Sequence, residues 1–139
     1  MMNAQLATLR VADLMSIEPV TVFDGASLAE AEKLMQQRGV TGLPVVDAAG
    51  RLVGVISQTD LLRAHVVDDH WARWPGLAVR HLMTSPALTI EADAPIAEAA
   101  AVMERHHVHR LVVETAGRPT GVLSTMDLVR ALVDGEEPG

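Results

Sequence analysis

The amino-acid sequence contains two copies of one pattern, and this duplication limits its possible folds more than any other feature. The segment at 79–83 matches the segment at 11–15, and Ser124 and Asp127 match Ser57 and Asp60. The offset between the copies is nearly constant and shortens by one residue in a turn. Proteins that stack many short repeats have periods of about 20–50 residues. Two copies at a longer period indicate instead a duplicated domain half.

Each copy predicts the element order strand, helix, strand, strand, helix. Short β-branched segments favour strands, and a Ser followed three residues later by Glu is typical of a helix start. In the first copy we expect a strand at 20–22, a helix that Ser27 to Glu30 opens and Gly39 ends, strands at 43–46 and 52–56, and a final helix that Ser57 caps.

The repeats also predict how the chain is divided. A single β-α-β-β-α unit leaves one apolar sheet face uncovered, and two units related by a pseudo-two-fold axis could bury these faces together. We therefore expect an α/β (α+β) fold of tandem repeats. The expected division is an N-terminal arm at 1–10, a first repeat at 11–66, a linker at 67–78, a second repeat at 79–133 and a flexible tail at 134–139.

Composition argues against several classes of function. The formal net charge of −7 opposes binding to nucleic acid or to an anionic membrane, which requires a basic face. The chain has no cysteine, no Gly-Lys-Ser/Thr phosphate loop and no His-Glu-x-x-His motif, so we expect no enzyme and no catalytic cofactor. It has no apolar run of about 20 residues and no secretory signal, so we expect a cytoplasmic protein.

The strand-to-helix junction at Ser57–Asp60 returns at Ser124–Asp127 and is the main candidate site. A helix N-terminus offers free backbone N–H groups and a positive dipole end, which suit an anion. An ionised carboxylate accepts hydrogen bonds and suits the two hydroxyls of a vicinal diol. The same Ser-x-x-Asp spacing is also close to a capping box, in which these side chains serve the helix. The two roles can coexist.

Taken together, these motifs resemble the CBS-domain pair, also called a Bateman module. The matching features are Leu-Met near each start, the segment 43–47, a Gly-Arg turn and a Gly-Val-x-Ser-x-x-Asp end, each in order and found twice over roughly residues 10–133. The resemblance implies a regulatory module that binds AMP, ADP, ATP or S-adenosylmethionine in clefts between the repeats. It also implies a homodimer, because such modules commonly pair into a four-repeat disk.

The resemblance implies roles for particular residues. The Ser and Asp of each junction match the ribose and phosphate motif, and His109-Arg110 resembles a segment whose cations reach nucleotide phosphates. Thr21 and Thr89 match positions near the base and sugar, and Val40 and Val108 match the apolar wall against adenine; a plain core or strand role is the alternative for these four. The first copy has the uncharged pair Thr41-Gly42 where the second has His109-Arg110, so we expect unequal clefts.

The remaining alternatives concern metal binding and mechanism. The histidines at 106, 107 and 109 lie where a helix gives way to a strand, so their side chains should diverge; we expect no metal site and favour a pH-sensitive phosphate contact. As a sensor, the module would signal to an unidentified target protein by conformational change. The alternative is a scaffold that dimerises and holds a partner without a ligand.

Overall fold

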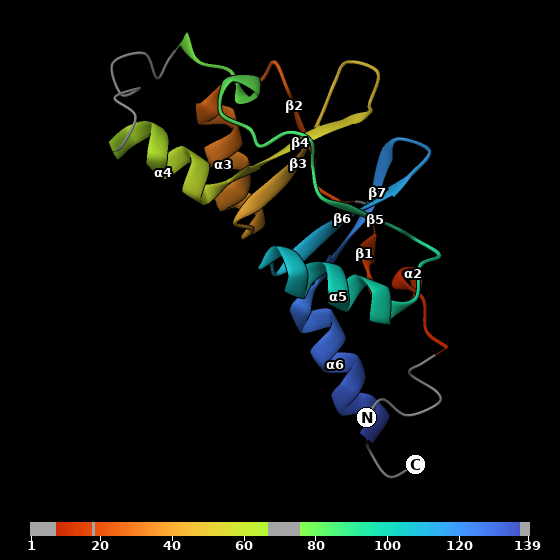
Figure 1. Cartoon of the computed structure of the whole chain (residues 1–139). Helices are drawn as coiled ribbons and strands as arrows, with labels where there is room; N and C mark the ends of the chain where they lie inside the picture. Colours follow the sequence, from red (N-terminus) through yellow and green to blue (C-terminus); the bar gives the residue numbers. More distant parts are fainter. Residues whose placement is uncertain (1–7, 18, 67–75, 137–139) are drawn as a thin grey trace. The chain divides into compact units, whose positions relative to one another are not determined.

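The backbone separates into two compact units (Figure 1). The computed structural model describes residues 8–17, 19–66 and 76–136. Unit 2 is the continuous segment Val20–Ala87, whereas unit 1 combines Met1–Pro19 with Leu88–Gly139. Among the described residues, every helix is too short or too polar to span a lipid bilayer.

Unit 2 contains one small sheet with two helices. Strands β2 (Val22–Phe23), β3 (Gly42–Val46) and β4 (Leu52–Ser57) lie in that order, β2 parallel and β4 antiparallel to β3. Helices α3 (Leu28–Arg38) and α4 (Gln58–Val66) lie beside the strands (Figure 1). Their buried apolar side chains form one core with the sheet: Leu28, Ala31, Met35, Leu43, Val45, Ile56 and Leu61.

Helix α3 of unit 2 begins and ends as the sequence predicts. Ser27 Oγ accepts a hydrogen bond from the Glu30 backbone N–H at 3.1 Å, which satisfies a free donor of the first turn of α3. Gly39 follows the helix in the left-handed conformation, with φ 65°. His107 takes the same conformation after the corresponding helix of unit 1, with φ 55°.

Unit 1 repeats this arrangement and adds a fourth strand. Its elements are α2 (Val11–Leu14), β1 (Ser16–Ile17), β5 (Thr89–Glu91), α5 (Ile96–His106), β6 (Arg110–Thr115), β7 (Arg118–Ser124) and α6 (Thr125–Glu136). The sheet order is β1-β7-β6-β5, with β5 parallel to β6 and the other neighbours antiparallel. The order β-α-β-β-α therefore occurs twice, and the predicted tandem α/β repeats are confirmed.

The segment that begins each sequence repeat is bound by residues of the other repeat. In unit 1 the Val11 N–H donates to the Ala94 carbonyl at 2.9 Å, and β1 pairs with β7. In unit 2 the Val79 N–H donates to the Ala26 carbonyl at 2.8 Å. These two hydrogen bonds occupy equivalent places in the two copies, and both valines are fully buried. The compact units are therefore not the sequence repeats themselves.

Two glycines allow the exchanged segments to approach the strands. A methyl group on Gly121 would lie 2.6 Å from Met15 Sδ and 2.7 Å from the Ser16 carbonyl oxygen. A methyl group on Gly54 would lie 2.7 Å from the Thr84 carbonyl oxygen. A backbone oxygen cannot move aside as a side chain can, so both positions require the smallest residue.

Several boundaries differ from those expected from the sequence. Helix α6 continues to Glu136, past residue 134 where the tail was expected to begin, because each added helical residue gains a backbone hydrogen bond. Of the expected arm, Leu9 accepts a hydrogen bond from the Ile96 N–H at 3.3 Å. Of the expected linker, 67–75 lies outside the described residues, whereas Leu77 accepts a hydrogen bond from the Leu28 N–H at 3.4 Å.

We predict that Gly121→Ala destabilises the protein. The new methyl group would be forced against the Ser16 carbonyl and Met15, and such overpacking costs about 1–3 kcal/mol of unfolding free energy. Urea denaturation followed by far-UV circular dichroism measures this. Gly42→Ala is the matched control, because its methyl group would meet no atom closer than 3.4 Å. Equal unfolding free energies for Gly121→Ala and the unchanged protein would contradict the close packing of β1 on β7.

Candidate functional site

The first junction is a closed capping arrangement between Ser57 and Asp60. The Ser57 N–H donates to Asp60 Oδ2 at 2.8 Å, and the Asp60 N–H donates to Ser57 Oγ at 3.1 Å. The Ser57 hydroxyl also donates to the same carboxylate oxygen, at 2.9 Å. The capping role foreseen for Ser-x-x-Asp is therefore present. It uses only Oδ2, so Asp60 Oδ1 accepts no hydrogen bond from the described part of the chain.

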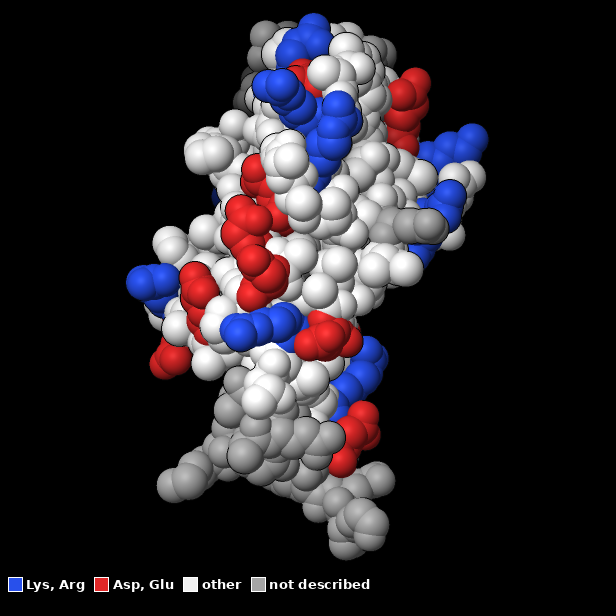
Figure 2. Space-filling view, turned by 90° about the vertical axis from the view of Figure 1, so that its right-hand side faces the viewer, with Lys and Arg blue, Asp and Glu red and all other residues white. Residues whose placement is uncertain are grey.

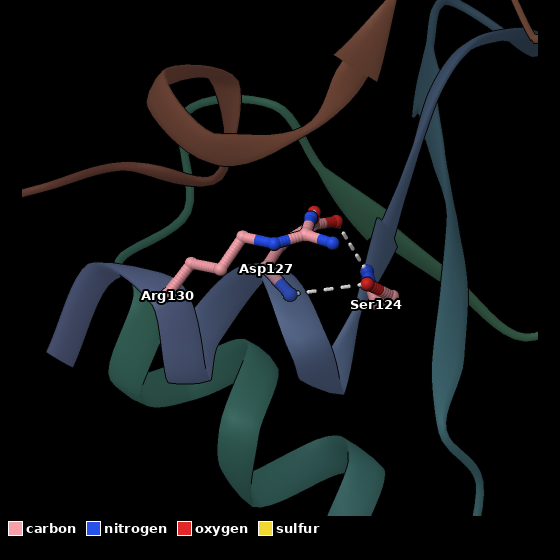
Figure 3. A network of polar contacts seen from close by, with 3 residues as sticks. All are labelled: Ser124, Asp127 and Arg130. Atoms are coloured by element: carbon pink, nitrogen blue, oxygen red, sulfur yellow. Dashed lines mark hydrogen bonds and ion pairs between the residues drawn. The ribbon is translucent and has the colours of Figure 1, made fainter. Parts of the chain in front are cut away.

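The second junction has the same reciprocal backbone bonds and one addition (Figure 3). The Ser124 N–H donates to Asp127 Oδ2 at 2.8 Å, and the Asp127 N–H donates to Ser124 Oγ at 3.1 Å. Arg130, one turn along α6, places its Nη1 3.4 Å from Asp127 Oδ1. The Asp127 side chain is 14% exposed and that of Arg130 is 70% exposed. The second carboxylate is thus accompanied by a cation.

Strand register places Arg110 next to Ser124. The two are direct partners in the β6–β7 pair, and Thr89 is the partner of Val112, two positions along β6 from Arg110. Alternate residues of a strand point to the same face. Arg110, Ser124 and Thr89 therefore share the sheet face opposite to Leu111, which packs in the core with α5. In unit 2, the partner of Ser57 is Gly42, which has no side chain.

The structure keeps the other predicted residues close to the strands of their own units. Thr21 precedes β2, which covers Val22–Phe23 and not the expected 20–22, whereas Thr89 begins β5. Val40 and Val108 are partly buried against the two cores, which is the plain packing role that the sequence left open. The Thr41 carbonyl accepts a hydrogen bond from the Gln58 N–H at 2.8 Å.

Unit 1 has an open depression of about 530 Å³ between α5 and α6, and the junction residues Ser124 and Asp127 do not line it. It lies instead on the helical side, where its lining includes Val108, His109 and Thr125. A hollow on that side does not contain the sheet face shared by Arg110 and Ser124. We therefore define the candidate site by the junction residues and their strand partners.

Two residues of the second junction were not singled out from the sequence. Thr125 donates both its N–H, at 2.8 Å, and its hydroxyl, at 3.0 Å, to the His109 carbonyl, and so ties the start of α6 to the strand that carries Arg110. The Arg130–Asp127 pair was also missed, although its i, i+3 spacing on a predicted helix could have indicated it.

The surface charge and the possible metal-binding side chains also bear on the sequence-based expectations. On the face that Figure 2 shows, acidic and basic side chains lie among one another, without the broad basic surface typical of nucleic-acid binding. Within the described ranges, no three His, Asp or Glu side chains are grouped so that they could hold a metal ion.

Comparison with known proteins gives the family. The family model described as "CBS domain" matches twice, over residues 11–67 and 79–134. A homoserine O-acetyltransferase of Methanococcoides burtonii is 34% identical over 88% of this chain, and a second, of Methanohalophilus mahii, is 31% identical over 96%. The matches cover only 24% and 26% of those two proteins, so this chain spans about a quarter of their length.

Solved structures with the same fold contain adenosine ligands. CBSX2 in complex with AMP has a TM-score of 0.81 and 30% identity, over 92% of this chain and 98% of that one. The CBS domain pair of protein MJ0100, in complex with 5′-methylthioadenosine and S-adenosyl-L-methionine, has a TM-score of 0.80 and 26% identity, over 94% and 99%. With two family matches over most of its length, this chain belongs to the CBS-domain family and carries two copies of the domain.

Proposed function

We propose that this chain is a regulatory module that binds adenosine-containing ligands at its two strand-to-helix junctions and does no chemistry on them. The observation that carries the proposal is the duplicated junction, in which capping occupies one oxygen of Asp60 and leaves the other without a partner in the described chain. A carboxylate oxygen with unused lone pairs suits the two hydroxyls of a ribose. Relatives with this fold that bind AMP and S-adenosylmethionine support the same ligand class.

The residues around each junction suit the other parts of such a ligand. Arg110 is exposed and stands next to Ser124, where its guanidinium could pair with a phosphate. We assign His109 to the same anionic group, and Thr41 to the equivalent place in the first copy. We assign Thr21 and Thr89 to the sugar, and the apolar side chains of Val40 and Val108 to the base.

The ligand would act as an effector and not as a catalytic cofactor. A ligand shifts a conformational equilibrium only if its affinity for the two states differs. We propose that such a shift is read by a separate target protein. The identity of the adenosine compound that acts in the cell, with ADP and ATP among the candidates, stays a prediction. The cytoplasmic location also stays a prediction.

We predict that the unchanged protein binds at least one of AMP, ADP, ATP, 5′-methylthioadenosine and S-adenosylmethionine, and that Asp60→Asn with Asp127→Asn weakens that binding by roughly 10- to 100-fold. The reason is that hydrogen bonds to a charged group contribute about 1.5–3 kcal/mol. Isothermal titration calorimetry measures the affinity. Asp93→Asn, which removes the same charge from an exposed residue that belongs to neither Ser-x-x-Asp junction, is the control. Folded protein that releases no heat with any of the five compounds would refute the proposal.

A second candidate function is a scaffold that pairs with a copy of itself without a ligand, and one surface favours the pairing. Helix α6 exposes four large apolar side chains: Met126 (54%), Val129 (42%), Leu132 (41%) and Val133 (55%). The hollow between α5 and α6 begins beside them, with Thr125 and Leu128 in its lining. A two-fold interface needs one patch that is complementary to itself, and a ridge next to a hollow meets this need. We therefore propose that a second copy of this chain covers α6.

We predict that the protein is a dimer and that Met126→Lys combined with Val129→Lys makes it monomeric, because the interface would have to bury two charges. Size-exclusion chromatography with light scattering gives the mass. Thr59→Lys is the control, because Thr59 occupies on α4 the place that Met126 has on α6. An unchanged protein of monomer mass, or equal dissociation by Thr59→Lys, would exclude pairing through α6.

A further inference from the structure

The two junctions have the same backbone hydrogen bonds but differ in the charged side chains around them. In unit 1, Asp127 has Arg130 3.4 Å from Oδ1, and Arg110 is the strand partner of Ser124. In unit 2, the position of Arg110 is taken by Gly42. Arg63 occupies the place of Arg130 but makes no ion pair with Asp60 in the described structure. The second junction thus has one cation at its carboxylate and a second cation on the strand residue beside Ser124, whereas Asp60 makes no ion pair in the described part of the chain.

The hydroxyl groups of Ser57 and Ser124 also differ, and the difference again favours an anion at the second junction. Ser57 Oγ donates its proton to Asp60 Oδ2 at 2.9 Å, so this hydroxyl is already used as a donor. Ser124 Oγ accepts a hydrogen bond from the Asp127 N–H, and its own proton has no acceptor among the described residues. Ser124 can therefore donate a hydrogen bond to an anion, whereas Ser57 can do so only by giving up its bond to Asp60.

These differences favour a phosphorylated ligand at the Asp127 junction and a ligand without a phosphate at the Asp60 junction. A phosphate next to Asp60 would face an uncompensated negative charge, and like charges repel. At Asp127 the negative charge is partly offset by Arg130, while Arg110 and the Ser124 hydroxyl donate no hydrogen bond within the described chain and so can bind phosphate oxygens. The Arg130 contact need not prevent ribose binding, because a carboxylate offers about four lone-pair sites on its two oxygens.

Resting on the function proposed above, we propose that the two junctions bind chemically different adenosine compounds. The Asp127 junction takes a phosphorylated compound, and Arg130 is a specificity-determining residue there because it neutralises the carboxylate. The Asp60 junction takes an adenosine compound without a phosphate, either neutral or carrying a positive charge near the sugar. The module would then report on two ligand pools at once.

The test uses AMP and 5′-methylthioadenosine, which share base and sugar and differ in the group on the 5′ carbon. Each is titrated by calorimetry into the full chain and into Asp60→Asn and Asp127→Asn separately. Asparagine keeps an oxygen that can accept the capping N–H, so the helices should remain, and circular dichroism verifies this. We expect Asp127→Asn to lower the affinity for AMP about tenfold or more and to leave the affinity for 5′-methylthioadenosine unchanged. We expect Asp60→Asn to lower the affinity for 5′-methylthioadenosine and to leave that for AMP unchanged.

A second pair of variants isolates the cation. Because Arg130 is largely exposed, its pairing with Asp127 is screened by solvent. Arg130→Gln should therefore lower the affinity for AMP by only about two- to fivefold and leave the affinity for 5′-methylthioadenosine unchanged. Arg63→Gln is the matched control and should change neither affinity.

The outcomes separate this proposal from the one on which it rests. If both compounds bind but lose affinity through the same substitution, or if Asp60→Asn alone removes AMP, the division of ligands is overturned and the sensor function stands. Equal affinity of Arg130→Gln and the unchanged protein for AMP would remove the role of Arg130. If the unchanged protein binds neither compound nor any other adenosine ligand, both proposals fail.

Discussion

Each compact unit is completed by a segment that the sequence assigns to the other repeat. The hydrogen bond from Val11 to Ala94 and that from Val79 to Ala26 occupy equivalent positions, and both valines are fully buried. Strand β1 then adds an edge to the larger sheet and pairs with β7 where Gly121 leaves room for Met15. Neither repeat could form its unit alone with the same core. The duplication is therefore a condition of folding and not only a record of ancestry.

The junctions show how one local motif can serve structure and binding together. A helix start needs acceptors for its first N–H groups, and Ser-x-x-Asp supplies them through Oγ and a single carboxylate oxygen. The second oxygen takes no part in the cap: at Asp60 it accepts no hydrogen bond from the described chain, and at Asp127 it lies 3.4 Å from Arg130 Nη1. It is this oxygen that the proposed ligand would use. Stability and binding therefore make demands on different atoms of the same side chain, which explains why a capping role is no argument against a binding role.

Duplication also allows the two sites to diverge without disturbing the fold. The bond lengths of the reciprocal cap are the same at Ser57–Asp60 and at Ser124–Asp127. The differences lie in exposed or missing side chains, namely Arg110 against Gly42 and the pairing of Arg130. Exposed substitutions of this kind usually change stability little, whereas they alter the local charge that a ligand meets.

The sequence by itself determined the element order, the two family copies and the Ser–Asp pairs, because capping, turns and strand periodicity depend on residues close together in the chain. It also indicated that the copies would differ in charge, since His109-Arg110 has no charged counterpart in the first. Only the tertiary structure decided which segment completes which unit, because nothing in the local sequence of 11–17 states which strand it will pair with. The same holds for the place of Arg110 beside Ser124, which depends on strand register and is therefore set by packing between parts of the chain that are distant in sequence.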